Sequence, residues 1–202
     1  MNRSNLPVTW IIAGLLVASV CWYFAFPQFY HPEDRENQVP VFEAAEIAAL
    51  LEFRKAQSTS TRIEIYEGLP HSFWETDSYE QQRTTANVRK VQENHFYADK
   101  LTPSKTDASI LNTLILNPQS FVKHQGPKLC GGFHADWLIE WESPSGERHQ
   151  LHLCFGCGEA AIYGPKHQLH CELSNNADSR FQLILSSYAK NRPPDERIIR
   201  RK

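Results

Sequence analysis

The sequence predicts an α+β domain, built from an antiparallel sheet with helices packed on one face and preceded by one N-terminal transmembrane helix. Three observations support this prediction: a long apolar run near the N-terminus, helical apolar spacing near both ends of the remaining chain, and short alternating segments between turn residues in its second half. Of the 202 residues, 41% are hydrophobic and 22% are charged, which is typical of a globular protein. The net charge of -2 argues against nucleic acid as a partner, since a duplex-binding protein needs a basic face.

The apolar run covers residues 8–26 and contains no charged side chain. At about 1.5 Å per residue it is long enough to cross a bilayer, and aromatic residues up to position 29 would lie at the membrane surface. Arg3 places residues 1–7 in the cytoplasm. We therefore expect a single-pass anchor at residues 8–29 in a bacterial inner membrane, followed by a periplasmic domain.

Two alternatives to this anchor stay open. Residues 17–19 could end a cleaved signal peptide, but cleavage there would leave an apolar stretch at the new N-terminus. Cys21 could be the acylated residue of a lipoprotein, but Val20 is larger than the small residue expected before such a cysteine. We favour the uncleaved anchor, which uses these apolar residues directly.

The rest of the chain divides into three parts. Residues 30–40 are polar and contain proline, which is typical of a linker. Residues 41–190 contain no internal repeat and have a suitable length for one exported domain with a single core. Residues 191–202 form a basic tail, which we expect to be a solvated terminus.

The first half of the domain is expected to mix helices and strands. Residues 41–56 place Ile47, Leu50 and Leu51 at helical spacing and predict an amphipathic helix. Residues 61–66 alternate apolar and polar side chains before a Gly-Leu-Pro turn and predict a strand. The other elements expected here are a short helix at 74–83, strand structure at 88–97, and a helix that starts at Ser104 or Asp107 and ends at Pro118.

The second half is expected to be mainly antiparallel sheet. Residues 137–141 and 149–155 flank a Ser-Pro-Ser-Gly turn and predict a β-hairpin. Residues 160–163 and 168–173 predict two further strands. The final element expected is a helix at 177–190, capped by Asn175 or Asn176, with an apolar stripe of Phe181, Ile184, Leu185 and Tyr188.

Cysteine and histidine are concentrated in this second half. Four of the five cysteines and five of the nine histidines lie between positions 126 and 171. In an exported domain, Cys130, Cys154, Cys157 and Cys171 favour one or two structural disulfides, and three pairings are open. The leading interpretation is therefore a binding or structural module with a disulfide-stapled half, without enzymatic activity and with an unidentified extracytoplasmic partner or ligand.

The rival interpretation is a metal- or thiol-dependent protein. Zinc or another transition metal needs a tetrahedral set of sulfur or imidazole ligands, which Cys130, His134, Cys154 and Cys157 could supply. Asp136 could then orient His134 by a hydrogen bond.

Strand alternation narrows the choice of metal ligands. In residues 149–155, alternation places Cys154 on the face opposite the core-facing leucines. In residues 168–173, it places Cys171 on the same face as the core-facing leucines. The two cysteines are therefore expected on opposite faces of the sheet, which disfavours a metal site made of four cysteines. The same alternation separates His149 from His152, and His167 from His170, so neither pair is expected to chelate a metal.

The Cys-x-x-Cys pair at 154–157 does not indicate redox or haem chemistry. The segment after it is too short for the helix that lowers the thiol pKa in thioredoxin-like proteins. Gly158 stands where haem attachment requires histidine.

Catalytic residues are indicated only weakly. Glu67 and His71 flank a turn and could bring an acid and a base together, with His134 or its neighbour Asp136 completing a hydrolase site. For both turns we favour a purely structural role. The common hydrolase, nucleotide-binding and zinc-protease motifs do not occur in the sequence.

Three motifs carry a resemblance. They are Tyr66-Glu67-Gly68-Leu69-Pro70-His71, Cys130-Gly131-Gly132-Phe133-His134-Ala135-Asp136 and Cys154-Phe155-Gly156-Cys157-Gly158-Glu159. In these motifs and their order, residues 63–188 resemble a group of small uncharacterised bacterial exported proteins. Several members of that group carry histidine at the position of Gly158 and proline at that of Ala135. The resemblance implies a single exported domain and no particular activity.

Overall fold

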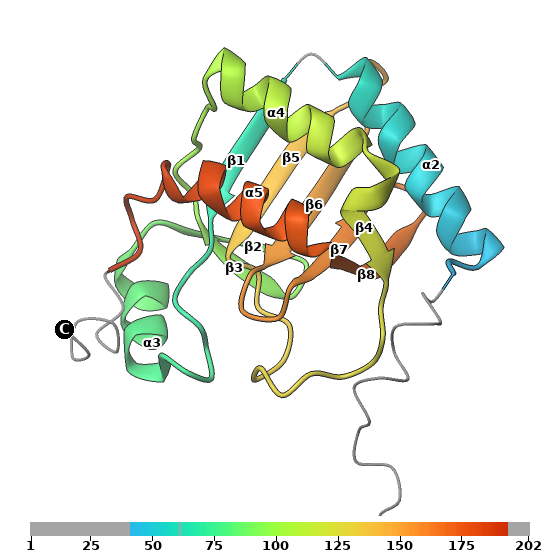
Figure 1. Ribbon diagram of the computed structural model, residues 1–202. Coiled ribbons are helices and arrows are strands. Elements are labelled where there is room, and N and C mark those ends of the chain that lie inside the picture. The colour runs from blue at the N-terminus through green and yellow to red at the C-terminus, as the bar shows by residue number, and fades with distance from the viewer. Residues whose placement is uncertain (1–40, 61, 194–202) are drawn as a thin grey trace, which may run out of the picture. The chain divides into compact units, whose positions relative to one another are not determined.

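The computed structural model describes residues 41–60 and 62–193 (Figure 1). The expected anchor at 8–29, the linker at 30–40 and most of the basic tail lie outside these described residues. Among the described helices, none combines the length and the apolar character that a membrane span requires. The α+β prediction is confirmed for the domain, because its strands pair antiparallel and its sheet is covered by helices.

A six-stranded antiparallel sheet lies at the centre of the domain, in the order β1-β5-β6-β7-β8-β4. Its strands are β1 (Ile63–Glu67), β4 (Phe121–Lys123), β5 (Trp137–Glu142), β6 (Arg148–Cys154), β7 (Glu159–Tyr163) and β8 (Gln168–Leu173). The hairpin expected around the Ser-Pro-Ser-Gly turn is confirmed as β5 and β6. Strand β4 was not expected, because three residues are too few to show an alternating pattern.

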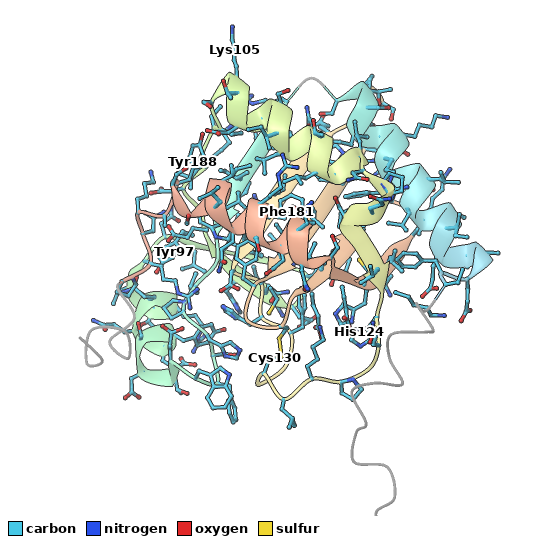
Figure 2. The ribbon with its side chains drawn as sticks, viewed as in Figure 1. Tyr97, Lys105, His124, Cys130, Phe181 and Tyr188 are labelled. Carbon is cyan, nitrogen blue, oxygen red and sulfur yellow. A yellow bond between two sulfur atoms is a disulfide. The ribbon has the colours of Figure 1, made fainter. Side chains whose placement is uncertain are left out.

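Three helices lie across one face of this sheet, as Figure 1 shows. They are α2 (Ala44–Thr59), α4 (Lys105–Leu116) and α5 (Asn175–Ser186), and a short 3-10 helix, η2 (Pro118–Ser120), follows α4. The main core lies between these helices and the sheet, where Phe53 of α2 packs edge-on against Trp141 of β5 with ring centroids 4.8 Å apart. Figure 2 marks Phe181 on α5, whose ring is fully buried in this core.

A separate hairpin packs on the other face of the sheet. Residues 88–97, expected to contribute strand, form β2 (Val88–Val91) and β3 (Asn94–Tyr97), which reverse at Gln92 with a positive φ of 52°. The ring of Phe96 meets the ring of His152 on β6, with centroids 5.2 Å apart. Helix α3 (Thr76–Thr85) packs on this hairpin through a hydrogen bond between Tyr79 and His95. The two faces of the sheet therefore have separate cores.

The helix ends show where local signals succeed and where they fail. Ser104 caps α4 by accepting a hydrogen bond from the backbone N–H of Asp107, as expected. Helix α5, however, is capped by Ser174, not by Asn175 or Asn176, and it ends at Ser186. Beyond this end, the backbone N–H groups of residues 190–192 bind the carboxylate of Glu67. The final helix is therefore confirmed as an element, although it runs from Asn175 to Ser186 and not over 177–190.

Candidate metal centre

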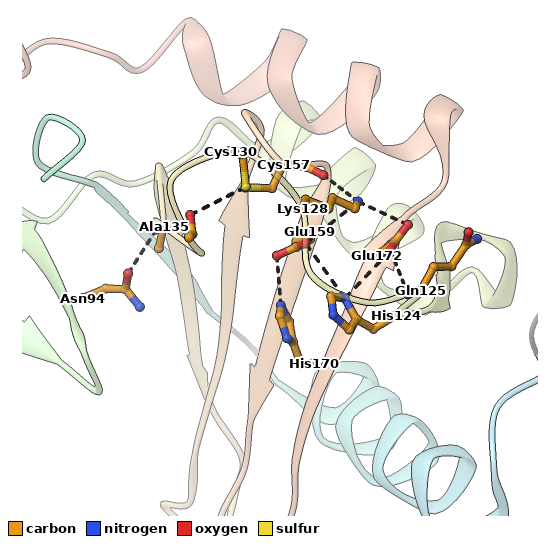
Figure 3. A network of polar contacts seen from close by, with 11 residues as sticks. Asn94, His124, Gln125, Lys128, Cys130, Ala135, Cys157, Glu159, His170 and Glu172 are labelled. Atoms are coloured by element: carbon orange, nitrogen blue, oxygen red, sulfur yellow. Dashed lines mark hydrogen bonds and ion pairs between the residues drawn. A yellow bond between two sulfur atoms is a disulfide. The ribbon is translucent and has the colours of Figure 1, made fainter. Parts of the chain in front are cut away.

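One disulfide closes the loop that follows β4. Cys130, in the loop between β4 and β5, is bonded to Cys157 in the turn between β6 and β7, 27 residues further along the chain. Of the one or two disulfides expected in this half, the structure has one, which joins Cys130 to Cys157 (Figure 3).

Cys154 and Cys171 are buried free thiols on opposite faces of the sheet. Cys171 belongs to the helix-covered core, whereas Cys154 follows His152 on the other face, as the alternation predicts. Burial raises the pKa of the Cys154 thiol to about 11 and raises that of Cys171 further still. Both groups are therefore protonated thiols near neutral pH, and neither is a ready nucleophile.

The metal ligands expected from the sequence are not assembled. Cys130 and Cys157 are joined to each other and therefore offer no thiolate. His134 is hydrogen-bonded through Nε2 to the backbone carbonyl of Leu69 at 2.9 Å. Asp136 does not orient His134 in the expected way, because its carboxylate accepts the backbone N–H of Phe155 and a guanidinium N–H of Arg192.

The residues of the weak hydrolase hypothesis come together only in part. The rings of His71 and His134 lie 4.6 Å apart, so the two turns do converge. Glu67, which is 2% exposed, instead receives the backbone N–H groups of residues 190–192. Burial lowers the pKa of His134 to about 4, so this imidazole is neutral at pH 7. The guanidinium group of Arg192 donates hydrogen bonds to Asp136 and Glu75. Residue 192 therefore packs on the domain, whereas a solvated tail was expected from residue 191 onward.

A different cluster of metal-ligating side chains forms at the β4, β7 and β8 strands. It comprises His124, Glu159 and His170, whose ligand atoms all lie within 4.8 Å of one another (Figure 3). Nε2 of His170 lies 3.2 Å from one carboxylate oxygen of Glu159, and Nδ1 of His124 lies 3.9 Å from the other. The two imidazole rings are stacked, with centroids 4.4 Å apart.

The strand register explains this convergence. Glu159 on β7 is paired with Glu172 on β8, and Ala161 is paired with His170, so Glu159, His170 and Glu172 share one face. Strand β4 pairs with β8 through Val122 and Glu172, and His124 lies two residues after Val122 on the same side. These residues face away from the helices because the intervening positions, such as Cys171, belong to the helix-covered core.

Glu172 and Lys128 complete the surroundings of the cluster. A carboxylate oxygen of Glu172 lies 3.8 Å from Nδ1 of His124 and also accepts the backbone N–H of Gln125. The ammonium group of Lys128 lies 3.2 Å from Glu172 and 3.9 Å from Glu159. His170 also lines a cavity of about 380 Å³ together with Phe133 and Tyr163, so one side of the cluster adjoins an open space.

Sequence reasoning missed this cluster for identifiable reasons. His124 lies outside the cysteine-rich segment and follows a strand that was not expected. His170 was considered only as a partner of His167, which lies next to Glu52 instead. The available signal was Glu159, an acidic residue at the start of an otherwise apolar strand.

Comparison of the chain with protein-family models, with curated proteins and with solved structures finds no match.

Proposed function

We propose that this protein is a membrane-tethered, extracytoplasmic binding module whose ligand is a divalent transition-metal ion such as zinc. The observation that supports the proposal is the convergence of His124, Glu159 and His170, from three segments of the chain, within 4.8 Å. The disulfide next to this cluster suits an oxidising compartment, and the apolar run at residues 8–26 suits a membrane tether.

The spacing of the ligand atoms is suitable for a metal. Zinc binds imidazole nitrogen and carboxylate oxygen at about 2.0 to 2.2 Å, so neighbouring ligand atoms in a tetrahedral site lie about 3.4 Å apart. The distances from Glu159 to His170 and His124 are 3.2 and 3.9 Å. Because the two imidazole rings are stacked, at least one of them would have to rotate for both nitrogens to face one ion.

The electrostatic state of the cluster also favours a cation. Glu159 is only 3% exposed, and a buried carboxylate is costly unless a positive group or hydrogen-bond donors compensate its charge. Nδ1 of His124 is buried and has no hydrogen-bond partner among the residues that the structure describes. Lys128 lies 3.9 Å from this carboxylate, so a metal ion bound to Glu159 and His124 would take over the compensation of its charge and would also satisfy the imidazole nitrogen.

The ligand types indicate which ions the site would prefer. Imidazole nitrogen suits zinc, copper, iron and nickel, whereas magnesium and calcium prefer sites made only of oxygen. Two histidines and one glutamate leave at least one coordination position for water or an exogenous ligand. A carboxylate oxygen of Glu172 lies 3.8 Å from the same Nδ1 of His124, so Glu172 could act as a further ligand.

Zinc titration of the full chain in detergent, purified without a histidine tag, tests the proposal. We expect one zinc ion per chain and a loss of affinity of at least about 100-fold for His170→Ala, because even changes beyond the direct ligands typically cost 10- to 100-fold. His167→Ala is the matched control, since His167 is exposed and lies next to Glu52 of α2. Equal zinc affinity in wild type, His170→Ala and His124→Ala would refute the proposal.

A further inference from the structure

We infer that the Cys130–Cys157 disulfide regulates the proposed metal site through Lys128, so that reduction of the disulfide increases the affinity for the metal. The inference rests on the proposed function, because it concerns the same carboxylates. It assigns to the disulfide a role beyond holding the domain together.

Lys128 occupies the place of a cation at the site. Its ammonium group lies 3.2 Å from a carboxylate oxygen of Glu172 and 3.9 Å from one of Glu159. It also donates a hydrogen bond of 2.7 Å to the backbone carbonyl of Cys157 (Figure 3). Lys128 therefore compensates the negative charge that a metal ion would otherwise compensate.

An ammonium group in this position opposes metal binding. A divalent ion held by Glu159 would lie within a few ångströms of the Lys128 charge, where like charges repel strongly in a partly buried site. Lys128 would have to move before the metal could bind, and that movement would break its contacts with Glu172 and Cys157. The affinity of the metal is therefore reduced by the free energy that holds Lys128 in place.

The disulfide is the covalent restraint on the segment that carries Lys128, and the Trp74 indole N–H also donates a hydrogen bond of 2.7 Å to the carbonyl of Cys130. On one side the segment is bonded to the site through the backbone N–H of Gln125 and the carboxylate of Glu172. On the other side, two residues after Lys128, Cys130 is covalently joined to Cys157, whose carbonyl accepts the Lys128 hydrogen bond. Gly126, with a φ of 110° and no neighbouring atoms at its Cβ position, gives the segment a point about which it can turn once the covalent bond is broken.

The redox step is an ordinary thiol–disulfide exchange with a dithiol reductant. One thiolate of the reductant attacks the partly exposed sulfur of Cys130, and Cys157 leaves as a thiolate that takes up a proton. The second thiol of the reductant then releases Cys130 as a thiol. The protein gains two electrons and two protons, and the dithiol becomes a disulfide.

The test compares zinc affinities in the full chain, measured by competition with a fluorescent chelator. The double substitution Cys130→Ser and Cys157→Ser mimics the reduced state without adding a reductant or new thiol ligands. We expect it to bind zinc about tenfold more tightly than wild type, or tighter still. Lys128→Met, with the disulfide intact, should give a similar gain, whereas Lys166→Met, which changes an exposed lysine between β7 and β8, should give none.

A double-mutant comparison isolates the mechanism. When Lys128→Met is combined with the two serine substitutions, zinc affinity should rise no further, because both changes remove the same repulsion. If the serine variant binds zinc as weakly as wild type, or more weakly, the regulatory inference is wrong although the metal site stands. If the serine variant fails to fold, the absence of a gain in Lys128→Met overturns the inference. Zinc binding in none of the folded variants would refute the proposed function itself.

Discussion

Two buried histidines on the hairpin-covered side of the sheet predict that the domain loses stability in mild acid. His152 is fully buried on β6, and His134 is 9% exposed in the loop before β5. Burial, together with the charge of Arg89, lowers the pKa of His152 to about 3. Burial lowers the pKa of His134 to about 4, and the neighbouring carboxylate of Asp136 only partly opposes this. Both pKa values lie well below the value of about 6.5 expected for histidine in an unfolded chain.

The sign of the effect follows from proton linkage. Between pH 6.5 and pH 4 the unfolded chain binds protons at these two histidines and the folded domain does not, so the free energy of unfolding falls as the pH falls. At pH 5 each histidine is expected to cost about 2 kcal/mol relative to pH 7.5, or about 4 kcal/mol for both. The stability contributed by keeping these rings neutral is fully present above pH 6.5 and is lost progressively below it.

Urea unfolding followed by tryptophan fluorescence at pH 7.5 and pH 5 measures this difference. His152→Gln provides the control, because the glutamine side chain does not titrate but can still accept the hydrogen bond from Asn94 that His152 Nδ1 accepts. The variant should lose about 2 kcal/mol of the wild-type pH dependence, which is the share expected from His152. A wild-type change below about 1 kcal/mol, or an unchanged pH dependence in His152→Gln, would refute the reasoning.

Two substitutions at the end of β1 test other parts of the structure. Glu67→Gln should destabilise the domain by about 2 kcal/mol, because a single amide oxygen cannot replace the two carboxylate oxygens that accept the N–H groups of residues 190–192. Thermal unfolding measures this loss of stability. An unchanged melting temperature would contradict the prediction. Gly68→Ala should cost about 3 kcal/mol, because its Cβ would lie 2.1 Å from the backbone oxygen of Ala135 and force the end of β1 away from the loop that precedes β5. Gly156→Ala is the control, because a Cβ at this position meets no atom within 4 Å, and the midpoint of chemical denaturation should stay nearly unchanged. Gly132 is unsuitable as a control, because its φ of 91° would itself strain an alanine.

The parts of the fold that were predictable depend on local patterns. Alternation alone separated Leu151 and Leu153 from His152 and Cys154, and the two groups do face opposite sides of the sheet. The apolar spacing around Leu50 likewise predicted α2, and Ser104, one of the two expected caps, does cap α4. Each of these features is decided by residues within a few positions of one another.

The candidate site was not predictable in this way because it depends on contacts between distant segments. His124 reaches Glu159 only because the three-residue strand β4 pairs with β8, a pairing that no local pattern specifies. The role of Glu67 depends on a segment more than 120 residues away, with sequence separations of 123 to 125. The choice of Cys130 as the partner of Cys157 likewise depends on the path of the loop after β4.

The most direct test of the central claim is anomalous X-ray diffraction at the zinc absorption edge, from crystals of the protein grown with zinc. We expect a single strong peak within coordination distance of His124, Glu159 and His170, with Lys128 displaced from Glu172. Zinc bound only elsewhere on the domain, with Lys128 still in contact with Glu172 and Glu159, would contradict it.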